Sequence, residues 1–361
     1  MCRFALSNKI SSFRILKLVL NGSLMFFSGE LGKCFKNRIP TLEAGYDISM
    51  AKVKEKEKKK SGFDYRSSRF FSLLFPAIYL VAIAIFSVQY SIIPGPEFLV
   101  LAFLIYAAYN QKTWRFLKDW LPFITVFISY EIMYGFVGVI SKYNLHAGPF
   151  NLEMGMFGQI PSLVLQQTMR MPILDYMGAF FYSLHFFAPT IFAFILWKVS
   201  PKNYWKYTVA FGICTYAALI SFLFYPVAPP WWELSTHSSL TYSGPTVIRV
   251  LTDSVDANLG IPVYRTLFDI FGANQFAAFP SMHSALPFLI SLFAIKIWKI
   301  RALPVLVFPI GVWFSAVYLG EHYFVDVLGG IAYAFLAFVA VEKILPLLAK
   351  RTDFLKKHMP N

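Results

Sequence analysis

The stretch Tyr318-Leu-Gly-Glu-His-Tyr-Phe-Val-Asp326 decides how the rest of the chain is interpreted. It places a histidine, His322, four residues before a carboxylate, Asp326. On a helix this spacing puts both side chains on one face, where the carboxylate holds one ring nitrogen and leaves the other free to attack. The stretch lies between two very apolar segments, and ionisable residues in such surroundings usually mark a functional site because they are costly to bury. We therefore expect a reaction centre here.

A second histidine, His283, lies in the string Phe279-Pro-Ser-Met-His283-Ser284. Two apolar segments, 284–298 and 303–319, separate it from His322. With its flanks each segment suffices for a helix of about 18 residues, which rises about 27 Å and nearly matches a bilayer core. Because two antiparallel spans return the chain to the side it left, we expect both histidines at the same membrane face.

The composition predicts a polytopic membrane protein, since 57% of the 361 residues are hydrophobic and only 14% are charged. The net charge of +14 does not indicate nucleic-acid binding, because the basic residues cluster in short segments between apolar runs, as they do in cytoplasmic loops. The three cysteines, Cys2, Cys34 and Cys214, form neither a metal-ligand pattern nor a disulfide framework.

Eight apolar segments are expected to span the membrane. They are 70–92, 97–109, 121–140, 173–197, 207–226, 284–298, 303–319 and 323–346. The second is short, and Pro94-Gly-Pro96 before it forces a tight turn. The connection 148–170 carries few charges and is expected to lie along the interface as a short amphipathic helix.

The connections between these spans alternate in charge. The basic ones are 52–69, 112–118, 198–206, 296–301 and 350–357. The others, which include the long segments 141–172 and 227–282, carry few Lys or Arg for their length. The positive-inside rule then predicts that both termini are cytoplasmic and that His283 and His322 are extracytoplasmic.

Changes of composition divide the chain into four expected parts. Residues 1–62 form a basic cytoplasmic segment, 63–118 an amino-terminal transmembrane hairpin, 119–348 a catalytic membrane domain and 349–361 a basic cytoplasmic tail. The sequence from Met50 onward has the character of an ordinary cytosolic amino terminus. A start at Met50 is therefore an alternative to a start at Met1.

The residues around the histidines fit phosphoryl transfer. Ser281 is expected to cap a helix whose free N–H groups and positive end bind a phosphate. His322, oriented by Asp326, would attack phosphorus and form a phosphohistidine, while His283 protonates the leaving alkoxide and later deprotonates an alcohol or water. Two alternatives stay open, a polar pair that only joins two helices and a metal site that includes Glu321.

The two histidine strings resemble the second and third motifs of the type 2 phosphatidic acid phosphatase (PAP2) superfamily, Pro280-Ser-Met-His283-Ser and Ser315-x6-His322-x3-Asp326. Within it, the likeness is closer to inositol phosphorylceramide synthases, through Ala228–Trp231, Leu174-Asp175 and Tyr182-Ser-Leu-His185. The resemblance covers about residues 120–346. It implies that His322 is the nucleophile, Asp326 its orienting partner and His283 the acid and base, with no cofactor or metal.

The chain also departs from the superfamily pattern. Ala316 stands where an arginine usually follows the motif serine, and no Lys-x6-Arg-Pro first motif is found. Because both motifs supply phosphate-binding cations, we expect other cations, first Arg249 and Arg265, to take their place. The remaining expected substrate-binding residues are Ser281, Ser315, Asp175 and His185.

These observations predict an all-α, multi-pass transmembrane bundle with about eight spans and a PAP2-like core in the last six. The expected function is transfer of a phospho-headgroup or phosphate between a membrane lipid and an alcohol, at the cell membrane. The lipid is a phospholipid or an isoprenoid phosphate. One alternative is a phosphatase for lipid phosphates or polyprenyl diphosphates, and another, from a different class, is a membrane transporter. No nucleic-acid partner is expected, and the sequence does not indicate an oligomeric state.

Overall fold

The structure, a computed structural model, describes residues 65–90, 95–141, 145–235, 244–270 and 274–348. The chain divides into two units, Met1–Ser68 and Arg69–Asn361, and nearly all described residues belong to the second. The expectations for residues 1–62, for a start at Met50 and for the tail 349–361 lie outside the described ranges. Within those ranges the chain is helical and contains no strand.

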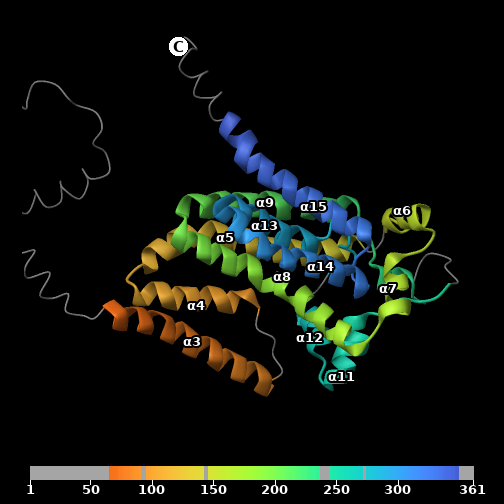
Figure 1. Cartoon of the computed structure of the whole chain (residues 1–361), viewed down its shortest axis with the longest axis horizontal. Coiled ribbons are helices and arrows are strands. Elements are labelled where there is room, and N and C mark those ends of the chain that lie inside the picture. Colours follow the sequence, from red (N-terminus) through yellow and green to blue (C-terminus); the bar gives the residue numbers. More distant parts are fainter. Residues whose placement is uncertain (1–64, 91–94, 142–144, 236–243, 271–273, 349–361) are drawn as a thin grey trace, which may run out of the picture. The chain divides into compact units, whose positions relative to one another are not determined.

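Each of the eight expected spans overlaps a helix (Figure 1). These helices are α3 (Tyr65–Tyr90), α4 (Pro96–Tyr109), α5 (Thr113–Ser141), α8 (Pro172–Val199), α9 (Pro201–Phe224), α13 (Met282–Trp298), α14 (Val307–Tyr318) and α15 (Phe324–Val339), which η3 (Ala340–Ile344) continues. Two of them are short, since α4 has only 14 residues and α14 only 12. A proline begins α4, α8 and α9, where its missing N–H costs nothing because the first turn leaves that group unpaired.

Four stretches among the described residues are long and apolar enough to cross a membrane. They are Pro172–Val199, Pro201–Phe224, Met282–Tyr318 and Phe324–Leu348. Shorter apolar stretches lie in α3 and α4, at Phe70–Phe86 and Glu97–Tyr109. The all-α membrane fold expected from composition is therefore confirmed.

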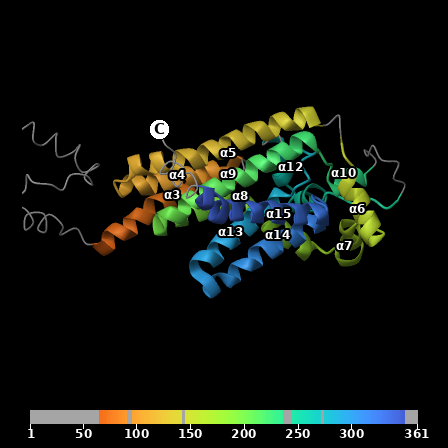
Figure 2. The ribbon, with the colours of Figure 1, turned by 90° about the horizontal axis from the view of Figure 1, so that it is seen from above.

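The stretch Met282–Tyr318 is folded back on itself. The 3₁₀ helix η2 (Lys299–Leu306) interrupts it, and Lys299 has a positive φ of 57°. The chain reverses there, so α13 and α14 pack side by side (Figure 2). This hairpin returns the chain to the end of the bundle at which it entered, as the spacing of the two histidines predicts.

The start of α13 packs very closely on α15. At Gly330 an added Cβ would lie 2.1 Å from both the carbonyl oxygen of Ser281 and the hydroxyl of Ser284. Ser284 Oγ donates a hydrogen bond to the Val327 carbonyl at 3.0 Å, and the Ser281 N–H donates to the Asp326 carbonyl at 3.0 Å. Only glycine permits this approach, which fixes the first turn of α13 against the first turns of α15.

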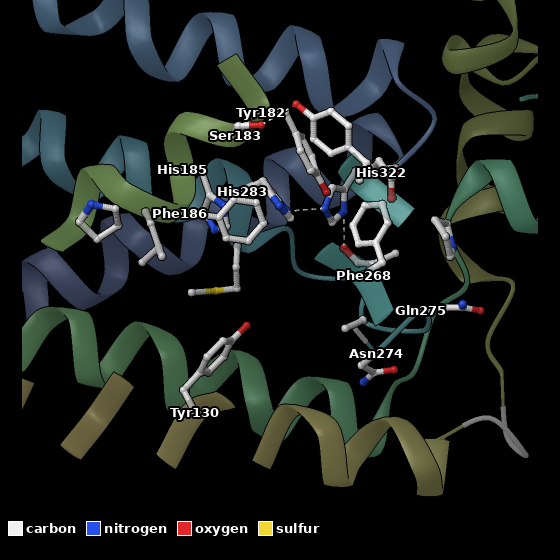
Figure 3. Close-up of a pocket in the computed structure, with 18 of the residues that line it drawn as sticks. Tyr130, Tyr182, Ser183, His185, Phe186, Phe268, Asn274, Gln275, His283 and His322 are labelled. Carbon is white, nitrogen blue, oxygen red and sulfur yellow. Dashed lines mark hydrogen bonds between the residues drawn. The ribbon is translucent and has the colours of Figure 1, made fainter. Parts of the chain in front are cut away.

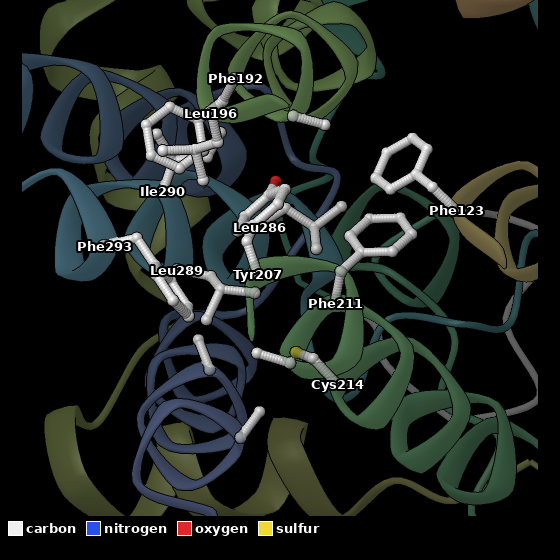
Figure 4. Close-up of a cluster of buried hydrophobic side chains, with 14 of the residues drawn as sticks. Phe123, Phe192, Leu196, Tyr207, Phe211, Cys214, Leu286, Leu289, Ile290 and Phe293 are labelled. Carbon is white, nitrogen blue, oxygen red and sulfur yellow. The ribbon is translucent and has the colours of Figure 1, made fainter. Parts of the chain in front are cut away.

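A buried aromatic and aliphatic core holds α13 from its other sides (Figure 4). Phe293 and Leu289 of α13 and Tyr207 of α9 are fully buried in it. Within a bilayer such packing stabilises through close van der Waals contact rather than through removal from water, so a rigid, well-filled core matters. The core thus gives His283 a firm support.

Short helices from the two long connections gather at the end of the bundle where α13 and α15 begin (Figures 1 and 2). They are α6 (Gly148–Phe157), α7 (Pro161–Met169), α10 (Pro230–Glu233), η1 (Leu251–Asp256), α11 (Ala257–Leu259) and α12 (Val263–Ile270). The expected single helix over 148–170 is two helices, because Gly158 ends α6 in the left-handed conformation with φ 69°.

Candidate active site

The structure brings His283 and His322 into direct contact (Figure 3). His283 lies in the first turn of α13, and His322 lies in the turn before α15. Nδ1 of His283 is 3.0 Å from Nε2 of His322. The cap expected at Ser281 is confirmed, since Ser281 Oγ accepts a hydrogen bond from the Ser284 N–H at 3.3 Å.

A main-chain carbonyl fixes the protonation pattern of His322. Its Nδ1 is 3.0 Å from the carbonyl oxygen of Ala278, which can only accept. Nδ1 therefore carries the proton, and Nε2 presents a lone pair in the ring plane. His283 donates to that lone pair from its own Nδ1. The His322 N–H is held as well, by the Ala316 carbonyl at 3.0 Å.

Asp326 lies beside His322 in a different way from the one its spacing suggests. Its Oδ2 is 3.8 Å from His322 Nδ1, too far for a hydrogen bond, and accepts from the Tyr323 N–H at 2.8 Å. The reason is that α15 begins at Phe324, so His322 precedes the helix and Asp326 occupies its third position. Asp326 is fully buried and acts on His322 through charge at short range.

The ring of His283 lies among aromatic rings of α8. It stacks on Tyr182, with centroids 3.9 Å apart and planes 16° apart, and its centroid is 4.0 Å from that of His185 (Figure 3). Its Nε2 is a buried atom without a hydrogen-bond partner in the described part of the chain. This nitrogen is therefore available to a substrate.

A buried ion pair joins the turn that contains His322 to the long connection before α13. Arg249 donates to Glu321 from Nε at 2.8 Å and from Nη2 at 3.2 Å. Its guanidinium lies over the rings of Trp231, at 4.4 Å, and Phe268, at 3.7 Å. Burial lowers the pKa of Arg249, but Glu321, with help from Tyr182 and Asp253, raises the pKa by more, so the side chain keeps its charge.

These groups line one end of a cavity of about 230 Å³. His283, His322, Arg249 and Glu321 are at its polar end. The rest of the lining is mainly apolar and comes from α5, α8, α9 and α13, with residues that include Phe127, Phe186, Phe211, Phe222 and Leu286. An amphiphilic cavity of this kind suits a molecule with an anionic headgroup and a hydrocarbon tail.

Asp175 lies outside the cavity lining. Its Oδ2 accepts from the Ser254 hydroxyl at 2.6 Å, and its Oδ1 accepts from the Tyr318 hydroxyl. These bonds tie the first turn of α8 to η1 and to the end of α14. The contacts of Asp175 are thus those of a buried structural link, and its expected role in substrate binding stays a prediction.

Three other expected binding residues also lie outside the cavity lining, whereas His185 lies within it. Ser281 and Ser315 are buried, and Ser315 Oγ donates to the Gly311 carbonyl at 2.6 Å. Arg265 is exposed, and its main-chain N–H donates a hydrogen bond to Oδ2 of Asp256 at 2.9 Å. Of the two cations first proposed, the structure therefore brings only Arg249 to the histidines.

Sequence reasoning missed three contributors to this site. The Ala278 carbonyl carries no side-chain signal at all. Glu321 enters the sequence prediction only as a possible metal ligand. Its partner in the structure is a cation, Arg249, which an acidic residue in an apolar stretch requires. Tyr182 lies within the string that marks the resemblance. Among the described residues, no group of three or more His, Cys, Asp or Glu is placed to hold a metal ion.

The chain is similar to a known family and to several known proteins. A family model described as the PAP2 superfamily matches residues 150–340. The chain is similar to a phosphoinositol dihydroceramide synthase of Bacteroides thetaiotaomicron, 28% identical over 236 residues, which cover 62% of this chain and 75% of the relative. No solved structure matches.

Two fungal relatives are similar over shorter regions. An inositol phosphorylceramide synthase catalytic subunit of Schizosaccharomyces pombe is 29% identical over 54% of this chain and 46% of its own length. An inositol phosphorylceramide synthase of Candida albicans is 28% identical over 50% and 38%. The chain spans less than half the length of these two relatives. Since the family model covers more than half of the chain, this protein belongs to the PAP2 superfamily and is a membrane enzyme of the lipid phosphotransferase and phosphatase class.

Proposed function

We propose that this enzyme transfers a phosphoinositol headgroup from a membrane phospholipid to the hydroxyl of a ceramide-like lipid, through a phosphohistidine at His322. The observation that carries the proposal is the arrangement of His322, whose Nδ1 donates to a carbonyl while Nε2 points at His283 in the polar end of the cavity. The headgroup and the acceptor class come from the relatives, which are named as synthases of phosphoinositol dihydroceramide and inositol phosphorylceramide.

In the first half-reaction, the phosphodiester displaces the direct hydrogen bond between the two histidines. Nε2 of His322 attacks phosphorus, so the N–P bond forms as the bond between phosphorus and the glycerol oxygen breaks. His283, as imidazolium, gives its proton to the departing oxygen. The products are a diacylglycerol, neutral His283 and phosphoinositol bound to His322.

In the second half-reaction, the acceptor takes the place of the diacylglycerol. Its hydroxyl loses a proton to His283, the oxygen attacks phosphorus, and the N–P bond breaks. His322 regains its lone pair and His283 is again protonated, so the cycle closes without an added acid or base. Stacking on Tyr182 holds the plane of the His283 ring in place for both proton transfers.

Arg249 is the proposed cation for the phosphate. Glu321 engages two of its nitrogens, and a guanidinium has five N–H donors, so Nη1 remains to reach a phosphate oxygen. The flanking rings of Trp231 and Phe268 restrict how the group can turn. This fixed donor takes over the task of the arginine that Ala316 replaces.

The acceptor is tested by product analysis. Purified enzyme in detergent is incubated with phosphatidylinositol, with and without ceramide. We expect phosphoinositol ceramide and diacylglycerol in equal amounts, and little free inositol phosphate. Free inositol phosphate that forms at the same rate without ceramide would instead establish a hydrolase that cleaves the phosphodiester with water. No release of diacylglycerol from any phospholipid would reject both.

We also propose that residues 119–348 form the catalytic domain, and that its histidines face the extracytoplasmic side with both termini in the cytoplasm. The alternation of basic connections supports this orientation. Labelling intact cells with an impermeant maleimide tests it, using Asn258→Cys and Lys202→Cys, both at exposed positions. Labelling of the first variant alone, above the background of the parent chain, is expected. Labelling of the second alone would reverse the orientation.

A further inference from the structure

Helix α6 directs its apolar side chains outward and a carboxylate inward. Its only buried residues are Pro149 and Glu153, and Glu153 is 0% exposed. Leu152, Met156 and Phe157 are between 45% and 53% exposed. An amphipathic helix usually does the reverse in water, so this pattern fits a helix whose outer face lies in the membrane interface.

The buried carboxylate reaches the helix that follows the catalytic turn. Glu153 Oε1 accepts a hydrogen bond from the Val325 N–H at 3.1 Å. Val325 lies in the first turn of α15, where N–H groups have no partner within the helix and a carboxylate is favoured by the helix dipole. The next residue is Asp326, and His322 lies three residues before Val325. Glu153 therefore holds the turn that carries the proposed nucleophile.

We propose that Glu153 is a positioning residue that fixes the start of α15, and with it Asp326 and His322, and that its protonation makes headgroup transfer pH-dependent. The proposal rests on the proposed function. It assigns Glu153 no contact with the substrate, since the side chain does not line the cavity.

The charged and titratable groups around Glu153 set the direction of the effect. Asp326 and Tyr323 face it from the start of α15, Glu233 of α10 adds its charge at Tyr323, and His322 lies beside Asp326. The pKa of Glu153 is raised to about 7 by burial first and by the charge of Asp326, against a lowering by the N–H groups of Val325 and Phe324. Glu153 is thus neutral below neutral pH and ionised above it.

Ionisation of Glu153 puts a second negative charge next to Asp326. The two carboxylates repel each other, and this repulsion disturbs the start of α15, which Glu153 holds at Val325 and Asp326 holds at Tyr323. Neutral Glu153 keeps its carbonyl oxygen as an acceptor for Val325 without this repulsion. We therefore expect transfer to weaken as pH rises through about 7, beyond what the histidines themselves cause.

The test uses the full chain in detergent, with phosphatidylinositol and ceramide, at about pH 6 and about pH 8.5. Glu153→Gln keeps the acceptor oxygen but cannot ionise. Its kcat should equal the wild-type kcat within about twofold at the lower pH and exceed it about threefold at the higher pH. Glu153→Ala should lower kcat about tenfold with KM nearly unchanged, because the turn is no longer fixed. Asn151→Ala, exposed on the same helix, is the matched control and should match wild type.

A ratio of Glu153→Gln to wild-type kcat that does not rise with pH would overturn the proposal, even if Glu153→Ala does not fold. Hydrogen exchange of the peptide that contains Val325 gives a readout independent of turnover. Glu153→Ala should exchange faster there than wild type and Asn151→Ala, and equal rates would also overturn the proposal. A wild-type enzyme that transfers nothing would reject the proposed function instead, and the exchange measurement would still decide whether Glu153 positions the turn.

Discussion

His283 belongs to a helix that is packed along its length in the bundle, whereas His322 lies in a turn between two helices. The first is supported by the core around α13 and by a serine cap. The second is supported by separate tertiary contacts, which come from Ala278, Ala316 and the ion pair of Glu321. This difference indicates that helix packing suffices to place His283, the proposed acid and base. His322, the proposed nucleophile, needs a separate contact for each of its ring nitrogens.

The largest effect is expected at the nucleophile. His322→Ala removes the only atom proposed to bond to phosphorus, so turnover should fall at least about 10⁴-fold, as for other covalent nucleophiles. Thermal unfolding and phospholipid binding should change little, because the alanine leaves the neighbouring ion pair intact. Turnover within about tenfold of wild type would contradict the assigned role.

A smaller effect is expected at His283, and it should depend on the leaving group. His283→Gln should lower transfer from phosphatidylinositol about 10³-fold, since general acid catalysis is lost. An activated ester such as a nitrophenyl phosphodiester needs no proton on departure. Its release of nitrophenol in the first turnover, before His283 acts as a base, should therefore fall less than about tenfold. An equal loss with both donors would mean that His283 does not act as the acid.

The next effect separates the two candidate cations. Arg249→Lys keeps a charge but loses the paired bonds to Glu321, so KM for the phospholipid should rise about tenfold, equivalent to about 1.4 kcal/mol. Arg265→Lys is the comparison at an exposed position outside the cavity and should leave KM unchanged. Equal effects from both substitutions, measured by steady-state kinetics, would remove Arg249 from the site.

The smallest effect concerns the contact that joins the two halves of the site. Gly330→Ala forces a Cβ to within 2.1 Å of Ser281 and Ser284, so α13 and α15 must move apart. We expect a melting temperature several degrees lower and turnover reduced about threefold. Gly155→Ala is the matched control on α6, since no atom lies within 4 Å of its added Cβ. A Gly330→Ala variant as stable and active as this control would show that the close approach is dispensable.

The sequence predicted the helices and the meeting of the histidines because both depend on local signals. Apolar runs of bilayer length define the spans, and the two successive runs 284–298 and 303–319 predict that the chain returns to the side it left. The contacts of His322 depend instead on long-range pairing. Arg249 finds Glu321, and Glu153 finds Val325, from distant parts of the chain. The hydrophobic periodicity of a sequence does not indicate which polar residues from distant segments will pair.

The orientation of Asp326 shows a second limit. The four-residue spacing of His322 and Asp326 predicts that both lie on one helix. The helix starts only at Phe324, however, and the Asp326 side chain turns back to cap it. The position of a helix end is set by competing caps, which a short string does not resolve. The Ala278 carbonyl, which sets the tautomer of His322, has no residue-type signature and required the folded chain.

The central claim is that His322 carries the phosphoryl group, and trapping tests it most directly. Wild type, His322→Ala and His283→Gln are each incubated briefly with phosphatidylinositol labelled at phosphorus, and the reaction is stopped in alkali. If His322 carries the phosphoryl group, wild type should hold a protein-bound label that survives base and is lost in acid, and His322→Ala should hold none. The label on wild type should be discharged by ceramide. Label that persists on His322→Ala, or label that is stable to acid, would contradict a phosphohistidine at this residue.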